Sequence, residues 1–147
     1  MGYNQALSAY RETRVRTASQ GTLVVMLYDG AIRHLGEAIS LLEGDFGKAP
    51  DKIEKINNHI LKGQEIITEL MASLDLAGGG DIAKNLLSLY AWFNDQLVQA
   101  NMEKQAGKII PVRAMMEDLR LAWVEIINST AVPAEVQSAP AGINIAG

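Results

Sequence analysis

Hydrophobic residues recur every three or four positions along most of the chain, which is the spacing of one face of an α-helix. Breaks rich in glycine or proline divide this pattern into four long segments. We expect helices from Ser19 to about Glu43, from Asp51 to Asp75, from Asp81 to the KQAGK break, and from Ile109 to Ser129. Their matched lengths and short connections predict an all-α fold, an antiparallel up-down four-helix bundle.

Each predicted helix carries an apolar stripe that we expect to face a shared core. The stripes consist of Leu23, Leu27, Ala31, Leu35, Ala38 and Leu42 on the first helix, Ile53, Ile56, Ile60, Ile67, Leu70 and Leu74 on the second, Leu86, Tyr90, Phe93, Leu97 and Asn101 on the third, and Val112, Met116, Leu119, Trp123 and Ile126 on the fourth. Ser19, Asp51 and Asp81 suit the N-cap positions of the first three helices. Pro111 suits the first turn of the fourth, where a missing N–H costs nothing.

The first and third helices carry more apolar surface than one stripe can bury. Five apolar residues follow one another from Leu23 to Leu27, and they point in every direction around a helix. On the first helix, the residues partly outside the stripe are Val24, Val25, Tyr28 and Ile32. On the third helix, the apolar side chains spread beyond one narrow seam at Leu89, Trp92 and Phe93. Either the N-terminal segment covers this surplus permanently, or the surplus forms a groove for a partner helix.

Both ends of the chain differ from the bundle, which we place at residues 17–130. Within residues 1–16 we expect a short helix in the stretch GYNQALSAYRE, with Tyr3, Leu7 and Tyr10 on one face. So short a helix is unstable alone in water, so this face must dock on something. Residues 131–147 contain two prolines, several small residues and one charge, and we expect a flexible tail.

Composition and charge narrow the function. A net charge of -4 does not produce the broad positive field that nucleic-acid binding needs. No segment has the length of a membrane span or the pattern of a signal peptide, so we expect a soluble, cytoplasmic protein. The chain has no cysteine and two histidines, and neither histidine follows a glutamate at the Glu-x-x-His spacing of di-iron bundles. We therefore expect no metal, no cofactor, no catalytic residues and no enzymatic activity.

Several stretches resemble the flagellar secretion chaperone family FliS. The family's signature is a Thr-Ala-Ser-Pro start with a Met-Leu-Tyr-Asp-Gly continuation, and this chain has TASQGTLVVMLYDGAI at residues 17–32. Further agreement lies in the stretches IITELMASLDLAGGGDIAKNLLSLYAWFNDQLVQAN and LRLAWVEI. Gln20 replaces the family's proline, which slightly weakens the helix start, and residues after Thr130 match no motif.

This resemblance implies a cytosolic chaperone that binds the C-terminal segment of flagellin and prevents its polymerisation before type III export. It implies that residues 1–16 act as a lid that competes for part of the binding surface. Other flagellar proteins are further candidate partners, and a weak homodimer is a further candidate state. The residues expected to contact the partner are Tyr10, Val24, Val25, Tyr28, Asn85, Leu89, Trp92, Phe93 and Asn101. Among them Asn85 and Asn101 suit hydrogen bonds to a client backbone, and Tyr10 and Tyr28 suit a rim.

Two rival functions remain open at the level of the sequence. A structural or regulatory bundle would use the apolar stripe for permanent self-association, and it would differ from a chaperone in stoichiometry. An enzyme built in the bundle core would require catalytic groups that converge from distant positions.

Overall fold

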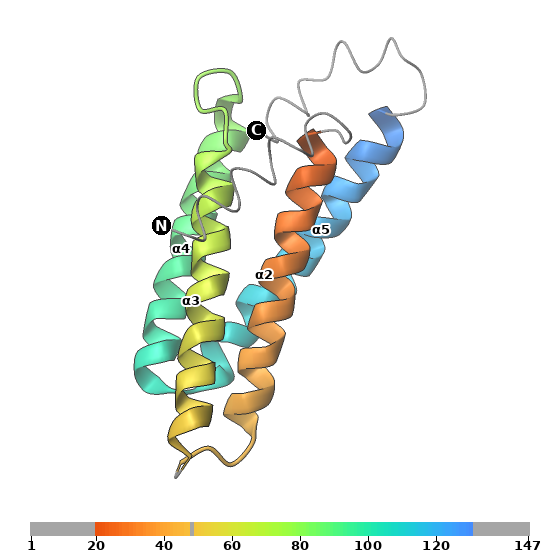
Figure 1. Cartoon of the computed structure of the whole chain (residues 1–147). Coiled ribbons are helices and arrows are strands. Elements are labelled where there is room, and N and C mark those ends of the chain that lie inside the picture. Colours follow the sequence, from red (N-terminus) through yellow and green to blue (C-terminus); the bar gives the residue numbers. More distant parts are fainter. Residues whose placement is uncertain (1–19, 48, 131–147) are drawn as a thin grey trace.

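The computed structural model describes residues 20–47 and 49–130, and these residues form four long α-helices. The helices are α2 (Gln20–Glu43), α3 (Pro50–Ala72), α4 (Gly80–Glu103) and α5 (Ile109–Thr130), and the short 3₁₀ helix η1 (Ala106–Lys108) precedes α5. Successive helices run in opposite directions (Figure 1). The predicted all-α, up-down bundle is therefore confirmed. The expected lid at residues 1–16 and tail at 131–147 lie outside the described residues.

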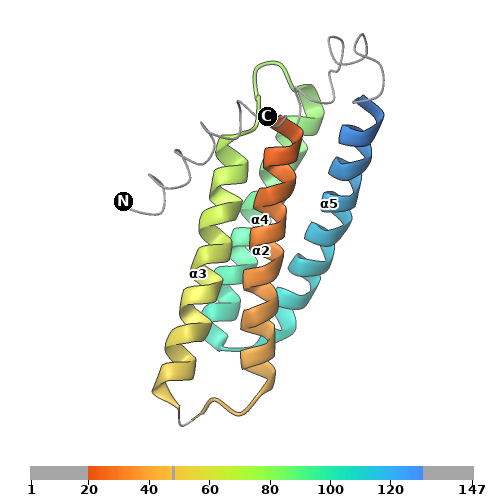
Figure 2. The same ribbon diagram turned by 45° about the vertical axis from the view of Figure 1, so that its right-hand side comes forward.

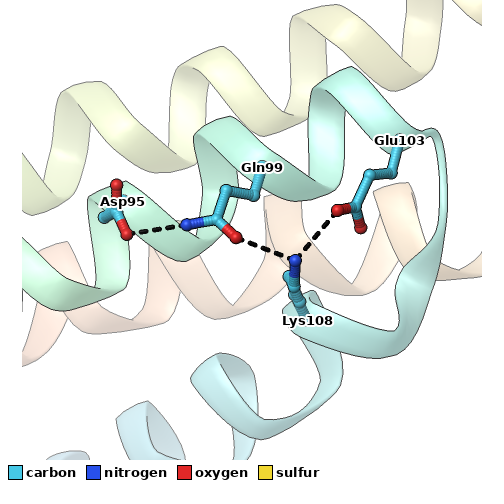
Figure 3. A network of polar contacts seen from close by, with 4 residues as sticks. All are labelled: Asp95, Gln99, Glu103 and Lys108. Carbon is cyan, nitrogen blue, oxygen red and sulfur yellow. Dashed lines mark hydrogen bonds and ion pairs between the residues drawn. The ribbon is translucent and has the colours of Figure 1, made fainter.

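The helices α4 and α5 meet at one end of the bundle and diverge toward the other (Figures 1 and 2). At the end where they meet, the Lys108 ammonium donates to Gln99 Oε1 at 2.8 Å and to Glu103 Oε2 at 2.9 Å (Figure 3). Gln99 Nε2 in turn donates to Asp95 at 2.8 Å. This chain of charge-assisted hydrogen bonds ties the start of α5 to the last turns of α4.

Two helix starts differ from the prediction. Asp51 and Asp81 lie inside the first turns of α3 and α4, and the residues at the N-cap positions are Ala49 and Gly79. The prediction that the two aspartates are caps is therefore wrong, because each helix begins before its aspartate. Their negative charges still favour the helix starts through the helix dipole.

Glycine is required at the turn into α4. Gly80 has a φ of +63°, a value that residues with a side chain rarely adopt. A β-carbon on Gly79 would lie 2.5 Å from the carbonyl oxygen of Asp75. The two glycines thus let the chain reverse tightly between α3 and α4.

The core follows the predicted stripes closely. All six stripe residues of the first helix are buried, as are most of those on the other three. Ile53 is an exception at 37% exposed, because the first turn of α3 lies at the end of the bundle. Val24 and Tyr28, which the pattern placed partly outside the stripe, are also buried. The buried face of α2 is broader than one stripe because α2 packs against both α3 and α5.

The helices α2 and α3 approach each other closely through glycine. A β-carbon on Gly63 would lie 2.9 Å from Leu35 Cδ2, and one on Gly30 would lie 3.2 Å from Ile66 Cδ1. The interpretation of Gly30 as a residue that permits close helix approach is therefore supported by the packing. Among the described helices, none combines the length and apolar character that crossing a membrane requires.

We expect Gly63→Ala to destabilise the bundle by about 1 to 3 kcal/mol, because the added methyl group would overpack the contact with Leu35. Gly107→Ala is the matched control, since a β-carbon there meets no atom within 4 Å. Urea unfolding of both variants measures the difference. Equal stabilities for the two variants would contradict the close packing of α2 against α3.

Candidate partner-binding site

One flank of α4 gathers most of the residues expected to contact a partner. Asn85, Leu89, Trp92 and Phe93 are spaced at i, i+4, i+7 and i+8, so they share one side of the helix. Phe93 is fully buried and Leu89 half-buried, whereas Asn85 is exposed and Trp92 is 40% exposed. The set therefore runs from the core to the surface.

This flank is the one turned toward α5. On the opposite flank of α4, Asn94 Nδ2 donates to Thr68 Oγ1 at 3.2 Å and Asn101 Nδ2 donates to Asn57 Oδ1 at 2.7 Å. Thr68 and Asn57 both belong to α3. Because α3 occupies that flank, the stripe that carries Asn85 and Trp92 borders α5.

On α5, apolar residues line the flank that borders α4. Arg113 Nε donates to the carbonyl oxygen of Ile32 at 3.0 Å, and Arg120 forms an ion pair with Asp29, so these two arginines mark the flank toward α2. Away from these arginines, the apolar residues next to the buried face of α5 are Met115, which is exposed, and Leu119 and Ile126, which are half-buried. We define the α4–α5 seam as Leu86, Leu89 and Trp92 of α4 with Met115, Leu119 and Ile126 of α5.

A buried polar contact lies in the core beneath the α4–α5 seam. The hydroxyl groups of Tyr28 and Tyr90 are 2.5 Å apart, and both side chains are fully buried. The contact therefore joins α2 and α4. Burial raises the pKa of both tyrosines, and both hydroxyls therefore stay neutral and able to donate.

The remaining expected contacts are distributed differently. Val24 and Tyr28 are buried and Val25 is half-buried, while Tyr10 lies outside the described residues. The interpretation of Tyr28 as a rim residue is corrected, because its hydroxyl lies in the core rather than at a wet edge. Asn101 lies on the α3 side of α4, where its Oδ1 accepts from Lys104 Nζ.

Two hollows outside the seam were not found from the sequence. One, of about 280 Å³, lies between α3 and α4. It is lined by Leu61, Gln64, Val98, Asn101, Met102 and Lys104. The other, of about 300 Å³, lies between α2 and α5. It is lined by Asp29, Ile32, Glu117, Arg120 and Leu121. Their exposed apolar residues fall outside the periodic core stripes, so helical spacing alone gives no signal for them.

Potential metal ligands do not gather in the described part of the chain. No three histidine, aspartate or glutamate side chains among residues 20–47 and 49–130 are arranged to hold a metal ion. The α4–α5 seam is apolar instead, and a partly exposed apolar surface of this kind suits burial of an amphipathic helix.

The comparisons with known proteins agree with this fold. The family model described as flagellar protein FliS matches residues 3–130. A flagellar secretion chaperone FliS from Bacillus subtilis is 30% identical over 129 residues, which cover 88% of this chain and 91% of the relative. Another from Salmonella typhimurium is 36% identical over 116 residues, which cover 78% of this chain and 82% of the relative.

These matches, together with the helical bundle, define a flagellar export chaperone. Membership of such a class implies a non-enzymatic role. More specifically, the chain belongs to the FliS family.

We expect Tyr28→Phe to destabilise the bundle by about 1 to 3 kcal/mol, because it leaves the Tyr90 hydroxyl buried without its partner. Tyr90→Phe is expected to cost a similar amount, since it leaves the Tyr28 hydroxyl without the same partner. Urea unfolding of the two single variants and the double variant gives the coupling. Additive effects would show that the two hydroxyl groups do not interact.

Proposed function

We propose that this protein is a cytosolic chaperone that binds the C-terminal region of flagellin and prevents its polymerisation before type III flagellar secretion. The observation that carries the proposal is the α4–α5 seam, an apolar surface left half-exposed between two diverging helices. Monomeric proteins rarely leave a contiguous apolar surface uncovered unless a partner uses it.

The chemistry of the seam fits an amphipathic helix as its occupant. Leu89 and Leu119 offer half-buried aliphatic surface from the two helices, and Trp92 offers a large, partly exposed ring. Tryptophan at the centre of an apolar contact is a frequent source of binding energy. Asn85 is exposed at the margin, where its amide can hydrogen-bond a client backbone.

No nucleotide is needed for this function. Binding alone covers the apolar face through which a client molecule would otherwise associate with other copies of itself. The client loses conformational entropy as it becomes ordered on the surface. The same surface would serve other flagellar proteins with a similar amphipathic segment. The rival, permanent self-association through the seam, predicts a stable dimer that does not take up a client.

Titration calorimetry with the C-terminal helical segment of flagellin is the direct test. We expect saturable one-to-one binding, and no binding of a segment from the central domain of flagellin. A closed dimer that binds neither segment would favour the rival function instead.

The seam itself is tested by Trp92→Ala, for which we expect affinity for the C-terminal segment to fall roughly 5- to 150-fold, or about 1 to 3 kcal/mol. Met102→Ala is the matched control, because Met102 is 77% exposed and lies on the α3 side of the same helix. Both substitutions are at exposed positions, so the melting temperatures should change little. Equal affinities for the two variants would place the client elsewhere on the bundle.

Removal of residues 1–11 tests the proposed lid. A competing segment within the chain lowers the apparent affinity for a client, so the truncated protein should bind the C-terminal segment more tightly. Unchanged or weaker binding in the same titration would argue against a lid.

A further inference from the structure

The chain's two histidines face each other across the contact between α2 and α3. His34 Nδ1 and His59 Nδ1 are 3.0 Å apart, and the centres of the two rings are 5.3 Å apart. With these distances the two nitrogens lie nearly on the line that joins the ring centres, so their lone-pair directions point at each other. This is the geometry of an N–H···N hydrogen bond.

The same geometry does not suit a metal ion. An ion on the line between the rings would need about 2.0 to 2.1 Å to each nitrogen, and the observed gap is too short for that. The contact therefore holds a proton rather than a metal.

Only a limited number of protons fits this contact. When both rings are neutral, one Nδ1 carries the proton and donates it, while the other Nδ1 accepts. A first added proton can bind the remote nitrogen of the donor ring, which leaves the hydrogen bond in place. A second added proton has only the acceptor Nδ1 left to bind, and two N–H groups would then face each other.

The surroundings oppose that second proton. Burial is the largest cause that lowers the pKa of His34, to about 4 from its ordinary 6.5. The positive charges of Arg33 on α2 and Lys62 on α3 act in the same direction, whereas Glu37 acts against them. Two imidazolium rings beside two further cations would repel one another.

The histidine contact lies beside the closest approach of the two helices. Leu35 follows His34 directly, and Gly63 lies one turn after His59, so the contact borders the point where α2 meets α3 through glycine. We propose that the His34–His59 hydrogen bond is an acid-sensitive latch that holds α2 against α3 until a second proton enters the pair. It is independent of the client surface between α4 and α5.

The sign of the effect follows from proton counting. Between pH 6.5 and 4 the unfolded chain binds a proton at His34 that the folded chain does not bind. The free energy of unfolding therefore falls as the pH falls through this window. Above pH 6.5 the neutral form of His34 dominates in both the folded and the unfolded chain, so the latch adds no pH dependence to the stability.

Nuclear magnetic resonance on the full-length protein tests the latch without any substitution, since every imidazole signal belongs to this pair. We expect opposite neutral tautomers for the two rings and one ring that gains its proton only near pH 4. The same neutral tautomer on both rings, with independent titration near pH 6.5, would overturn the proposal.

His34→Asn provides a second test, because the asparagine amide can donate to His59 Nδ1 but cannot gain a charge. At pH 7 its urea midpoint should stay close to that of the natural protein. Between pH 6.5 and 4 the midpoint should fall less than that of the natural protein. His59→Asn keeps His34 and its burial, so its midpoint should fall more than that of His34→Asn in the same window. A fall in His34→Asn as large as that of the natural protein would contradict the latch, since carboxylates common to both proteins would then account for the whole pH dependence.

Discussion

The hydrogen bond between the Tyr28 and Tyr90 hydroxyl groups constrains how the helices can pack. It lies among apolar side chains, where an unpaired hydroxyl is costly, so each tyrosine must face the other. A rotation or a one-turn shift of α2 against α4 would separate the two hydroxyl groups, and apolar packing alone would penalise such shifts less. The contact thus selects one arrangement of the core.

The contact between α2 and α3 and the contact between α4 and α5 differ in how closely the helices approach. Between α2 and α3, glycines at positions 30 and 63 let the backbones approach, and the His34–His59 contact joins the two helices beside them. Between α4 and α5 the chain is tied at one end by Lys108, and the helices then diverge (Figures 1 and 3). Within the described residues, the bundle therefore combines one closely packed helix pair with one pair that separates along its length (Figure 1).

Helical spacing predicted the fold because burial of a stripe every three or four residues leaves few alternatives to a bundle of four matched helices. The same reasoning placed Val24 and Tyr28 partly outside the core, since a single helix does not reveal how many neighbours it has. The starts of α3 and α4 depended on local turns at Ala49 and Gly79 rather than on the aspartates nearby. The histidine contact requires the register of two helices, which one sequence does not specify.

The apolar run at the start of α2 belongs mainly to the core. Leu23, Val24 and Leu27 are buried by neighbouring helices, so their apolar side chains stabilise the core that the helices share. Leu89 and Leu119 of the α4–α5 seam are only half-buried, and Trp92 is 40% exposed. The residues that fill the core around Tyr28 and Tyr90 therefore differ from those that line the seam. Under the proposed function, a substitution in the seam changes affinity for the client while the Tyr28–Tyr90 contact keeps the bundle intact.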